Sequence, residues 1–238
     1  MYIVLLYILQ HFGGALLRTK LSDRILPTYT KGEEIFNMVS HIVGGAFAIF
    51  ALVSAILFSA FKGSVYGVVT SSVYGASMIL LYCMSSIYHG LRPGIAKKVL
   101  QVLDHCTIYM LIAGTYTPIL LCALRPVYPV IAWVVFGIEW GCAALAITLT
   151  AIDLKQYRVF SMICYVMMGW AIIFAVVPTI EVLTVPGFLY VLGGGILYTI
   201  GAILYGLGKK RRYMHNAFHV FVIGGSVLQY LGIVLYAL

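Results

Sequence analysis

Five residues in this sequence have the side-chain types and spacing that metal-assisted hydrolysis requires. His215 and His219 stand four residues apart, and His89 follows Ser85 at the same spacing. Residues at i and i+4 share one face of an α-helix, so the pair can offer two imidazoles to one metal ion, with His89 as a third. Three histidines on zinc leave a fourth position for water, whose pKa falls to about 7. Asp104 could then act as general base, and Ser85 could orient a ligand or donate to an oxyanion.

A structural role is the competing interpretation for each of these histidines. A single histidine in an apolar helix is more often a hydrogen-bonded core residue, and an isolated H-x-x-x-H pair is weak evidence for a metal. For His41 and His105 we favour the structural interpretation. Glu34, Asn37 and His41 lie together at the start of an apolar run and are assigned no definite role beyond possible support of a metal site.

Composition places these residues in a membrane protein. The 238 residues are 63% hydrophobic and 9% charged, against roughly 25% charged in soluble domains. A membrane-spanning helix needs roughly 20 apolar residues, and the sequence lacks the two-residue alternation of barrel strands. We therefore predict an all-α bundle of seven transmembrane helices in the cell membrane. The predicted spans are about 36–60, 65–90, 100–122, 127–149, 159–180, 187–207 and 215–237.

The distribution of Lys and Arg predicts the orientation. Thirteen of the fifteen basic residues lie in alternate loops, which the positive-inside rule assigns to the cytoplasm. Only Lys62 and Arg125 lie on the other side. The N-terminus is therefore predicted to be cytoplasmic and the C-terminus outside. The cytoplasmic set is Arg18, Lys20, Arg24, Lys31, Arg92, Lys97, Lys98, Lys155, Arg158, Lys209, Lys210, Arg211 and Arg212.

This topology brings the chemically suited residues to one depth of the membrane. His89 ends the second span, Asp104 lies near the start of the third, and His215 and His219 open the seventh. Each lies about one to three helical turns from a basic loop, roughly 5–15 Å. Ionisable residues inside spans are costly and mark functional sites, so we predict a zinc site near the cytoplasmic face. Glu139, in the middle of the fourth span, is left without a role.

The remaining features narrow the class of protein. The net charge of +8 reflects loops that face anionic lipid, and no basic stripe interleaved with exposed aromatics predicts nucleic-acid binding. The five cysteines lie inside apolar runs without paired spacing, which disfavours disulfides and a cysteine zinc site. Residues 1–32 form an N-terminal extension, in which the apolar stretch 1–17 fits an interfacial helix better than a signal peptide. Residues 33–238 form one membrane domain.

Four stretches also carry a family resemblance: EEIFNMVSHIVGG (33–45), SSIYHGL (85–91), LDHCTIYMLIAGTYTPI (103–119) and HNAFHVFVIGGS (215–226). In these motifs the chain resembles the haemolysin-III-related proteins, within the superfamily of progestin and adiponectin receptors. The resemblance implies seven helices, an inside N-terminus and a zinc ion on the three histidines. It places the family aspartate and serine at Asp104 and Ser85, and the first-helix motif at Glu34, Asn37 and His41.

Three functions compete. The first is an intramembrane zinc hydrolase of a lipid amide or ester, similar to ceramidases, with membrane lipids as partners. The second is a membrane-lytic or pore-forming protein, as the family name implies, although the helices offer no clear polar lumen. The third is a lipid-responsive receptor or membrane-stress sensor in which zinc only joins helices. We rank them in that order.

Overall fold

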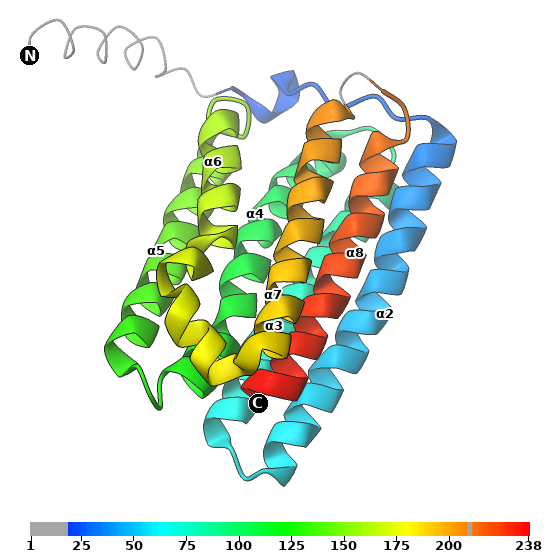
Figure 1. Cartoon of the computed structure of the whole chain (residues 1–238). Coiled ribbons are helices and arrows are strands. Elements are labelled where there is room, and N and C mark those ends of the chain that lie inside the picture. Colours follow the sequence, from blue (N-terminus) through cyan, green and yellow to red (C-terminus); the bar gives the residue numbers. More distant parts are fainter. Residues whose placement is uncertain (1–18, 209–210) are drawn as a thin grey trace, which may run out of the picture.

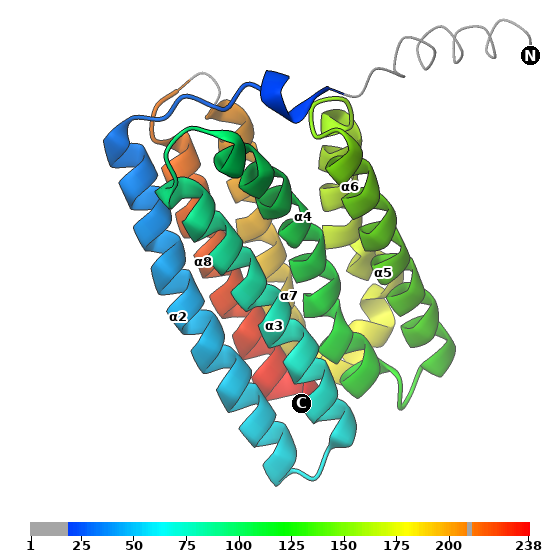
Figure 2. The same ribbon diagram turned by 180° about the vertical axis from the view of Figure 1, so that it is seen from behind.

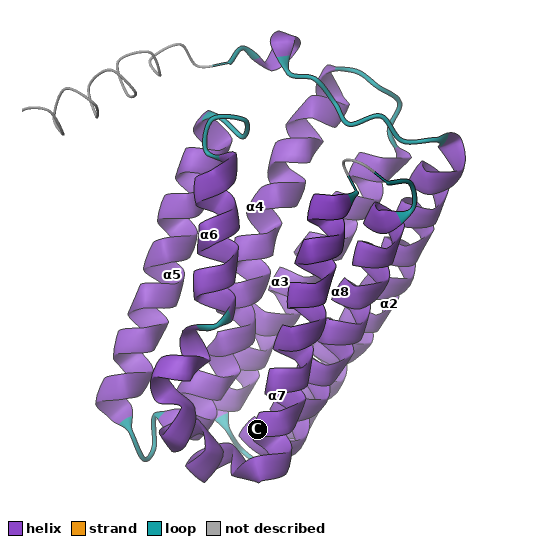
Figure 3. Ribbon diagram, turned by 45° about the horizontal axis from the view of Figure 1, so that its top comes forward, coloured by secondary structure: helices purple, strands orange, loops and turns teal. Residues whose placement is uncertain are grey.

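The computed structural model describes residues 19–208 and 211–238, and in this part of the chain every element of secondary structure is a helix (Figures 1 and 3). Long helices pack side by side into one bundle, as predicted. The elements are η1 (Leu21–Asp23), α2 (Lys31–Phe61), α3 (Val65–Gly90), α4 (Ile95–Pro118), η2 (Ile119–Leu124), α5 (Pro129–Ile152), α6 (Arg158–Gly169), η3 (Ala171–Ala175), α7 (Val176–Leu207), α8 (Met214–Gly232) and η4 (Ile233–Ala237).

Six of the described helical stretches are long and apolar enough to cross a membrane. One of them, Arg158–Leu207, contains both the fifth and the sixth predicted span. In Figure 1 the chain descends through α6 and the first part of α7 and rises again through the rest of α7. The reversal lies at Thr184, whose φ of 60° and ψ of 168° are not helical. A count of seven crossings remains a prediction.

Pro186 illustrates how this reversal is built. It was expected between two spans, but it lies inside the range of α7, two residues after the kink at Thr184. Proline has no backbone N–H and is well tolerated in the first turn of a helix. Pro186 therefore starts the second piece of α7 and does not interrupt it.

Helices α2 and α4 begin earlier than the apolar runs predicted. Helix α2 starts at Lys31 because Thr30 caps it: the Thr30 side chain accepts from the Glu33 backbone N–H, and the Glu33 carboxylate accepts from the Thr30 backbone N–H. Such a capping box stabilises a helix start made of polar residues. Helix α4 starts at Ile95, so Lys97 lies inside the helix and is buried. The prediction that Lys97 lies in a loop is therefore wrong.

The bundle is apolar on its outer faces and holds many polar side chains within its hydrophobic core. Large apolar side chains such as Phe50, Val53 and Ile138 are more than half or about half exposed on the outer faces, as expected for surfaces that contact lipid. Inside, Ser226 of α8 is fully buried and bonds to the hydroxyls of Tyr82 and Tyr198 at 2.7 and 2.9 Å. These bonds tie α3, α7 and α8 together behind the predicted site.

Candidate metal centre

The helix ends that carry the predicted site residues meet at one end of the bundle. The start of α2, the end of α3 and the starts of α4 and α8 all lie at the end where the α3–α4, α5–α6 and α7–α8 connections run (Figures 1 and 2). The Lys62 turn and the turn after η2 lie at the opposite end. The convergence predicted from alternating loops is therefore present in the structure.

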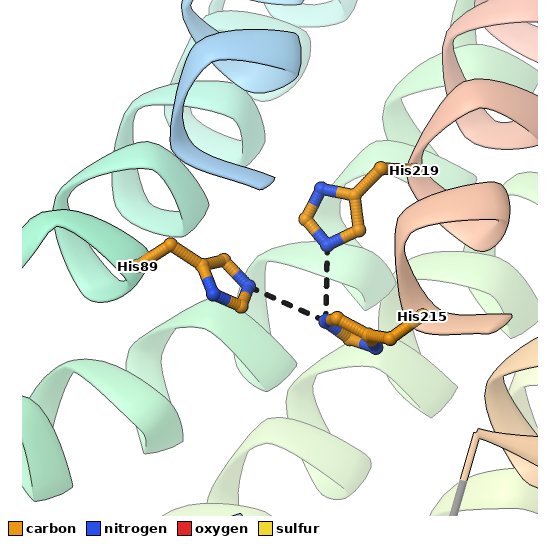
Figure 4. Close-up of side chains that lie close together, drawn as sticks. All are labelled: His89, His215 and His219. Carbon is orange, nitrogen blue, oxygen red and sulfur yellow. Dashed lines mark hydrogen bonds between the residues drawn. The ribbon is translucent and has the colours of Figure 1, made fainter. Parts of the chain in front are cut away.

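His89, His215 and His219 come together at this end and are all buried (Figure 4). The Nε2 atom of His215 lies 3.3 Å from Nε2 of His89 and 3.0 Å from Nε2 of His219. All three ligand atoms lie within 4.8 Å of one another, so the group could hold a metal ion. The first two turns of α8 supply one face of this group, and the last turn of α3 supplies the other.

Glu34 holds His89 in this orientation. Its Oε2 atom lies 2.6 Å from His89 Nδ1, and its Oε1 atom accepts from Lys97 Nζ at 2.5 Å. Lys97 also donates to the backbone carbonyl of Leu91 at 3.0 Å. Because the carboxylate accepts from Nδ1–H, the lone pair of His89 is left on Nε2, which faces the other histidines. The buried Lys97 was missed because its role depends on the approach of three helices.

Glu33 fixes the start of α8 on the same side. Its Oε1 atom accepts from the Tyr213 backbone N–H at 3.0 Å, and its backbone carbonyl accepts from Asn216 Nδ2 at 3.3 Å. Tyr213 has φ of +65°, an unusual conformation that turns the chain into α8. Glu33, the partner of Thr30 in the capping box of α2, therefore also positions the helix that carries His215 and His219. The Thr-x-x-Glu pattern at 30–33 is typical of a helix cap. No pattern in the sequence indicates that Glu33 also contacts the start of α8.

Tyr29, from the segment before α2, packs against the histidines. Its ring stacks on His215, with centroids 4.9 Å apart and planes 21° apart, and lies 5.8 Å from the ring of His89. Burial raises the pKa of its hydroxyl above the usual range for tyrosine, so this group stays neutral at neutral pH. Tyr29 belongs to the segment before α2, where sequence pattern gave no signal of function.

A cavity of about 180 Å³ extends from His215 and His219 into the bundle. Most of its lining is apolar, including Leu81, Ile108 and Val222. Its polar lining includes the two residues predicted to act beside the metal, Ser85 and Asp104. Ser85 is buried and Asp104 is half-buried. The structure therefore brings both to the same space as His215 and His219.

His105 and His41, the two histidines assigned a structural role from the sequence, differ in their hydrogen bonds. His105 lies against the Gln101 carbonyl through Nδ1, at 2.7 Å, and against the Tyr205 hydroxyl through Nε2, at 3.2 Å. Both its nitrogens are occupied, as expected for a structural residue. His41 is buried and packs on His219 with centroids 3.8 Å apart, yet neither of its nitrogens has a hydrogen-bond partner in the described chain.

Comparison with known proteins identifies the family. The family model described as "Haemolysin-III related" matches residues 29–230. The chain belongs to the haemolysin-III-related family. It is 40% identical to a protein named Hemolysin-3 from Bacillus cereus over 189 residues, covering 79% of this chain and 84% of that protein. It is 37% identical to a Hemolysin-3 homolog from Bacillus subtilis (strain 168) over 193 residues, covering 81% and 89%. This haemolysin-III-related chain is a multi-pass integral membrane protein, and its histidine group lies within the matched range.

Proposed function

We propose that this protein is a zinc-dependent hydrolase that cleaves an amide or ester bond of a membrane lipid. The observation that carries the proposal is the position of the three-histidine group, two of whose members, His215 and His219, line the same largely apolar cavity as Ser85 and Asp104. A soluble substrate would not need an apolar cavity inside a bundle whose outer surface faces lipid.

The donor set fits zinc. Imidazole nitrogens are common zinc ligands at about 2.0–2.1 Å, which places two tetrahedral ligands about 3.3 Å apart. The separations of 3.0 and 3.3 Å between Nε2 atoms are close to that value. Three protein ligands leave a position for water, as in catalytic zinc sites. When bound, zinc supplies a Lewis acid that makes water nucleophilic at neutral pH.

The residues of the chain have separable tasks in this hydrolysis. The Asp104 carboxylate accepts a proton from the attacking water, whose oxygen forms a bond to the carbonyl carbon. The Ser85 hydroxyl donates to the carbonyl oxygen as negative charge develops on it. When the carbon–nitrogen or carbon–oxygen ester bond breaks, the proton passes from Asp104 to the leaving amine or alcohol. The cavity holds the apolar part of the substrate; its volume of about 180 Å³ exceeds that of an engineered cavity of about 150 Å³ that binds benzene.

The first experiment measures zinc per chain after purification in mild detergent without added metal. We expect about one zinc in the wild type, lost in His89→Ala, His215→Ala and His219→Ala and retained in the control His105→Gln. The zinc-loaded protein is then given a panel of lipid amides and esters, and fatty acid release is measured. We expect Asp104→Asn to keep zinc and to lose about 100-fold or more of the rate. Zinc-loaded wild type that releases no fatty acid from any lipid in the panel would refute the hydrolase.

A membrane-lytic function is the second candidate, and it rests on the names of the two Hemolysin-3 relatives. The same variants separate it from hydrolysis. Leakage of a dye from liposomes that is equal in wild type and in the three histidine variants would favour lysis independent of the site. A sensor with structural zinc would be favoured if Asp104→Asn kept wild-type signalling.

A further inference from the structure

The interface between α2 and α8 contains an unusual concentration of buried polar atoms without partners. Asn37 is fully buried, and neither its Oδ1 nor its Nδ2 has a hydrogen-bond partner in the described chain. The same holds for both nitrogens of His41, for Nδ1 of His219 and for Oδ1 of Asn216. Buried polar atoms without partners are few in native proteins, and each costs about 1–3 kcal/mol. These are six atoms on four side chains of two helices in contact, and the rings of His41 and His219 lie directly against each other, which indicates that something polar occupies this interface.

The contacts of His89 show what His219 lacks. Both are candidate metal ligands through Nε2, but His89 Nδ1 faces the Glu34 carboxylate at 2.6 Å, whereas His219 Nδ1 is buried without a partner. A histidine that binds metal almost always donates its other N–H to a carboxylate, a carbonyl or water, which fixes its tautomer and its orientation. No described residue of the chain accepts a hydrogen bond from His219 Nδ1–H, so its acceptor must be another group.

One face of α2 carries three polar residues, one of which packs on His219. Glu34, Asn37 and His41 are spaced by three and four residues, so they share that face of the helix. Glu34 at one end of the row contacts His89, and His41 at the other end packs on His219 at 3.8 Å. Asn37 lies between them in sequence and offers an acceptor and a donor on one side chain.

We propose that Asn37 and His41 enclose an ordered water that accepts from His219 Nδ1–H, and that Asn37 is a positioning residue for this ligand. A buried water typically makes about three hydrogen bonds to polar groups that would otherwise lack partners. The water donates to the Asn37 carbonyl oxygen and to a ring nitrogen of His41. Helix α2 thus orients both ligand-bearing helices, through Glu34 on His89 and through Asn37 on His219. This inference rests on the metal site of the proposed function.

The test compares the zinc affinity of purified variants by competition with a chromophoric chelator. Asn37→Leu keeps the approximate volume but removes both hydrogen-bonding groups, and we expect zinc to bind about 10–100-fold more weakly. Asn37→Asp keeps an acceptor, and we expect its affinity to stay within about tenfold of wild type. Thr150→Val is the matched control: Thr150 is fully buried and bonds to Tyr109 and Ser161 on the far side of the bundle, so its loss leaves zinc affinity unchanged.

Cobalt substitution gives a readout that a merely structural residue would not move. We expect the visible absorption of the Co²⁺ protein to shift in Asn37→Leu and not in Thr150→Val, because the bond to His219 alters the ligand field. Wild-type zinc affinity and an unshifted cobalt spectrum in Asn37→Leu would overturn this inference but would leave the metal site of the proposed function standing. Wild type that binds neither zinc nor cobalt would overturn the metal site and the inference with it. If Asn37→Leu does not fold, a loss of affinity well beyond tenfold in folded Asn37→Asp would also reject the positioning role.

Discussion

Glu34 joins three helices at the histidine cluster. From α2 it contacts His89 of α3 and Lys97 of α4, at 2.6 and 2.5 Å. The side chain of Lys97 is nearly inaccessible and that of Glu34 is one-fifth exposed, so water screens their attraction only partly. Such a pair stabilises little compared with apolar packing, but removal of one partner leaves a buried charge uncompensated. The pair therefore serves to fix His89 more than to raise overall stability.

The Glu34–Lys97 pair predicts a non-additive double-mutant cycle. We expect Lys97→Met or Glu34→Gln alone to destabilise the metal-free protein by about 3 kcal/mol, and the double variant to recover part of that loss. Glu34→Gln should also weaken zinc binding about 10–100-fold, because the amide is a poorer acceptor for His89 Nδ1–H. Thermal unfolding in detergent and chelator competition measure the two effects. Additive losses of stability would show that the two side chains do not act as a pair.

At the scale of elements, the segment before α2 forms a strap across the site. It is attached at several points: the Thr19 backbone N–H donates to the Asp153 carboxylate at 2.7 Å, and Lys98 Nζ donates to the Ser22 carbonyl at 2.5 Å. Figure 2 shows it crossing the end of the bundle from the α5–α6 turn to the start of α2. Its last residues place Tyr29 on His215. The strap therefore links the α5–α6 turn to the histidine group.

Attachment of the strap should depend on pH through Asp153. Burial raises the pKa of this carboxyl, but hydrogen bonds from Thr19, Gln156 and Lys155 together lower it below the usual value for aspartate. A carboxyl with a lowered pKa stabilises the fold above its unfolded pKa of about 3.9, and this contribution is lost as the pH falls through the folded pKa. We expect Asp153→Asn to lower the thermal midpoint at pH 7, and the difference from wild type to shrink below about pH 4. A difference that is constant from pH 7 to pH 3 would argue against this; Asp23→Asn, at an exposed position, is the control.

Sequence predicted those parts of the structure that depend on local pattern. Apolar runs gave the helices, alternating basic loops gave the shared end of the bundle, and the four-residue spacing placed His215 and His219 on one face. The burial of Lys97, the contact of Glu33 with Tyr213 and the stacking of Tyr29 depend on how separate elements approach one another. No pattern within a single segment carries that information. The predicted starts of α2 and α4 were too late because their first turns contain polar residues, which an apolar run does not include. In α2 a cap at Thr30 stabilises such a turn.

At the scale of the whole molecule, the basic connections and the histidine group lie at the same end of the bundle. The α3–α4, α5–α6 and α7–α8 connections, which hold basic residues such as Arg92, Lys155 and Arg211, surround the end that contains the histidines. Lys62 and Arg125 lie at the opposite end. If the basic end faces the cytoplasm, the histidine group lies near the cytoplasmic surface of the membrane, within reach of the bonds that join lipid headgroups to acyl chains. The depth of the site and the proposed substrate class therefore depend on one orientation.

That orientation, and the number of crossings, can be tested together. In Figure 1 the described chain starts at the basic end of the bundle and its C-terminus lies at the other end, as an odd number of crossings requires. We expect a C-terminal alkaline phosphatase fusion to be active and a C-terminal green fluorescent protein fusion to be dark, because both report an external C-terminus. Fusions truncated after Ile152, before the Arg158–Leu207 stretch, should give the opposite result, since four crossings would return the chain to the cytoplasm. A fluorescent full-length fusion, beside a truncated fusion that behaves as expected, would mean that Arg158–Leu207 crosses the membrane only once. That would leave six crossings and would contradict the reversal of the chain at Thr184.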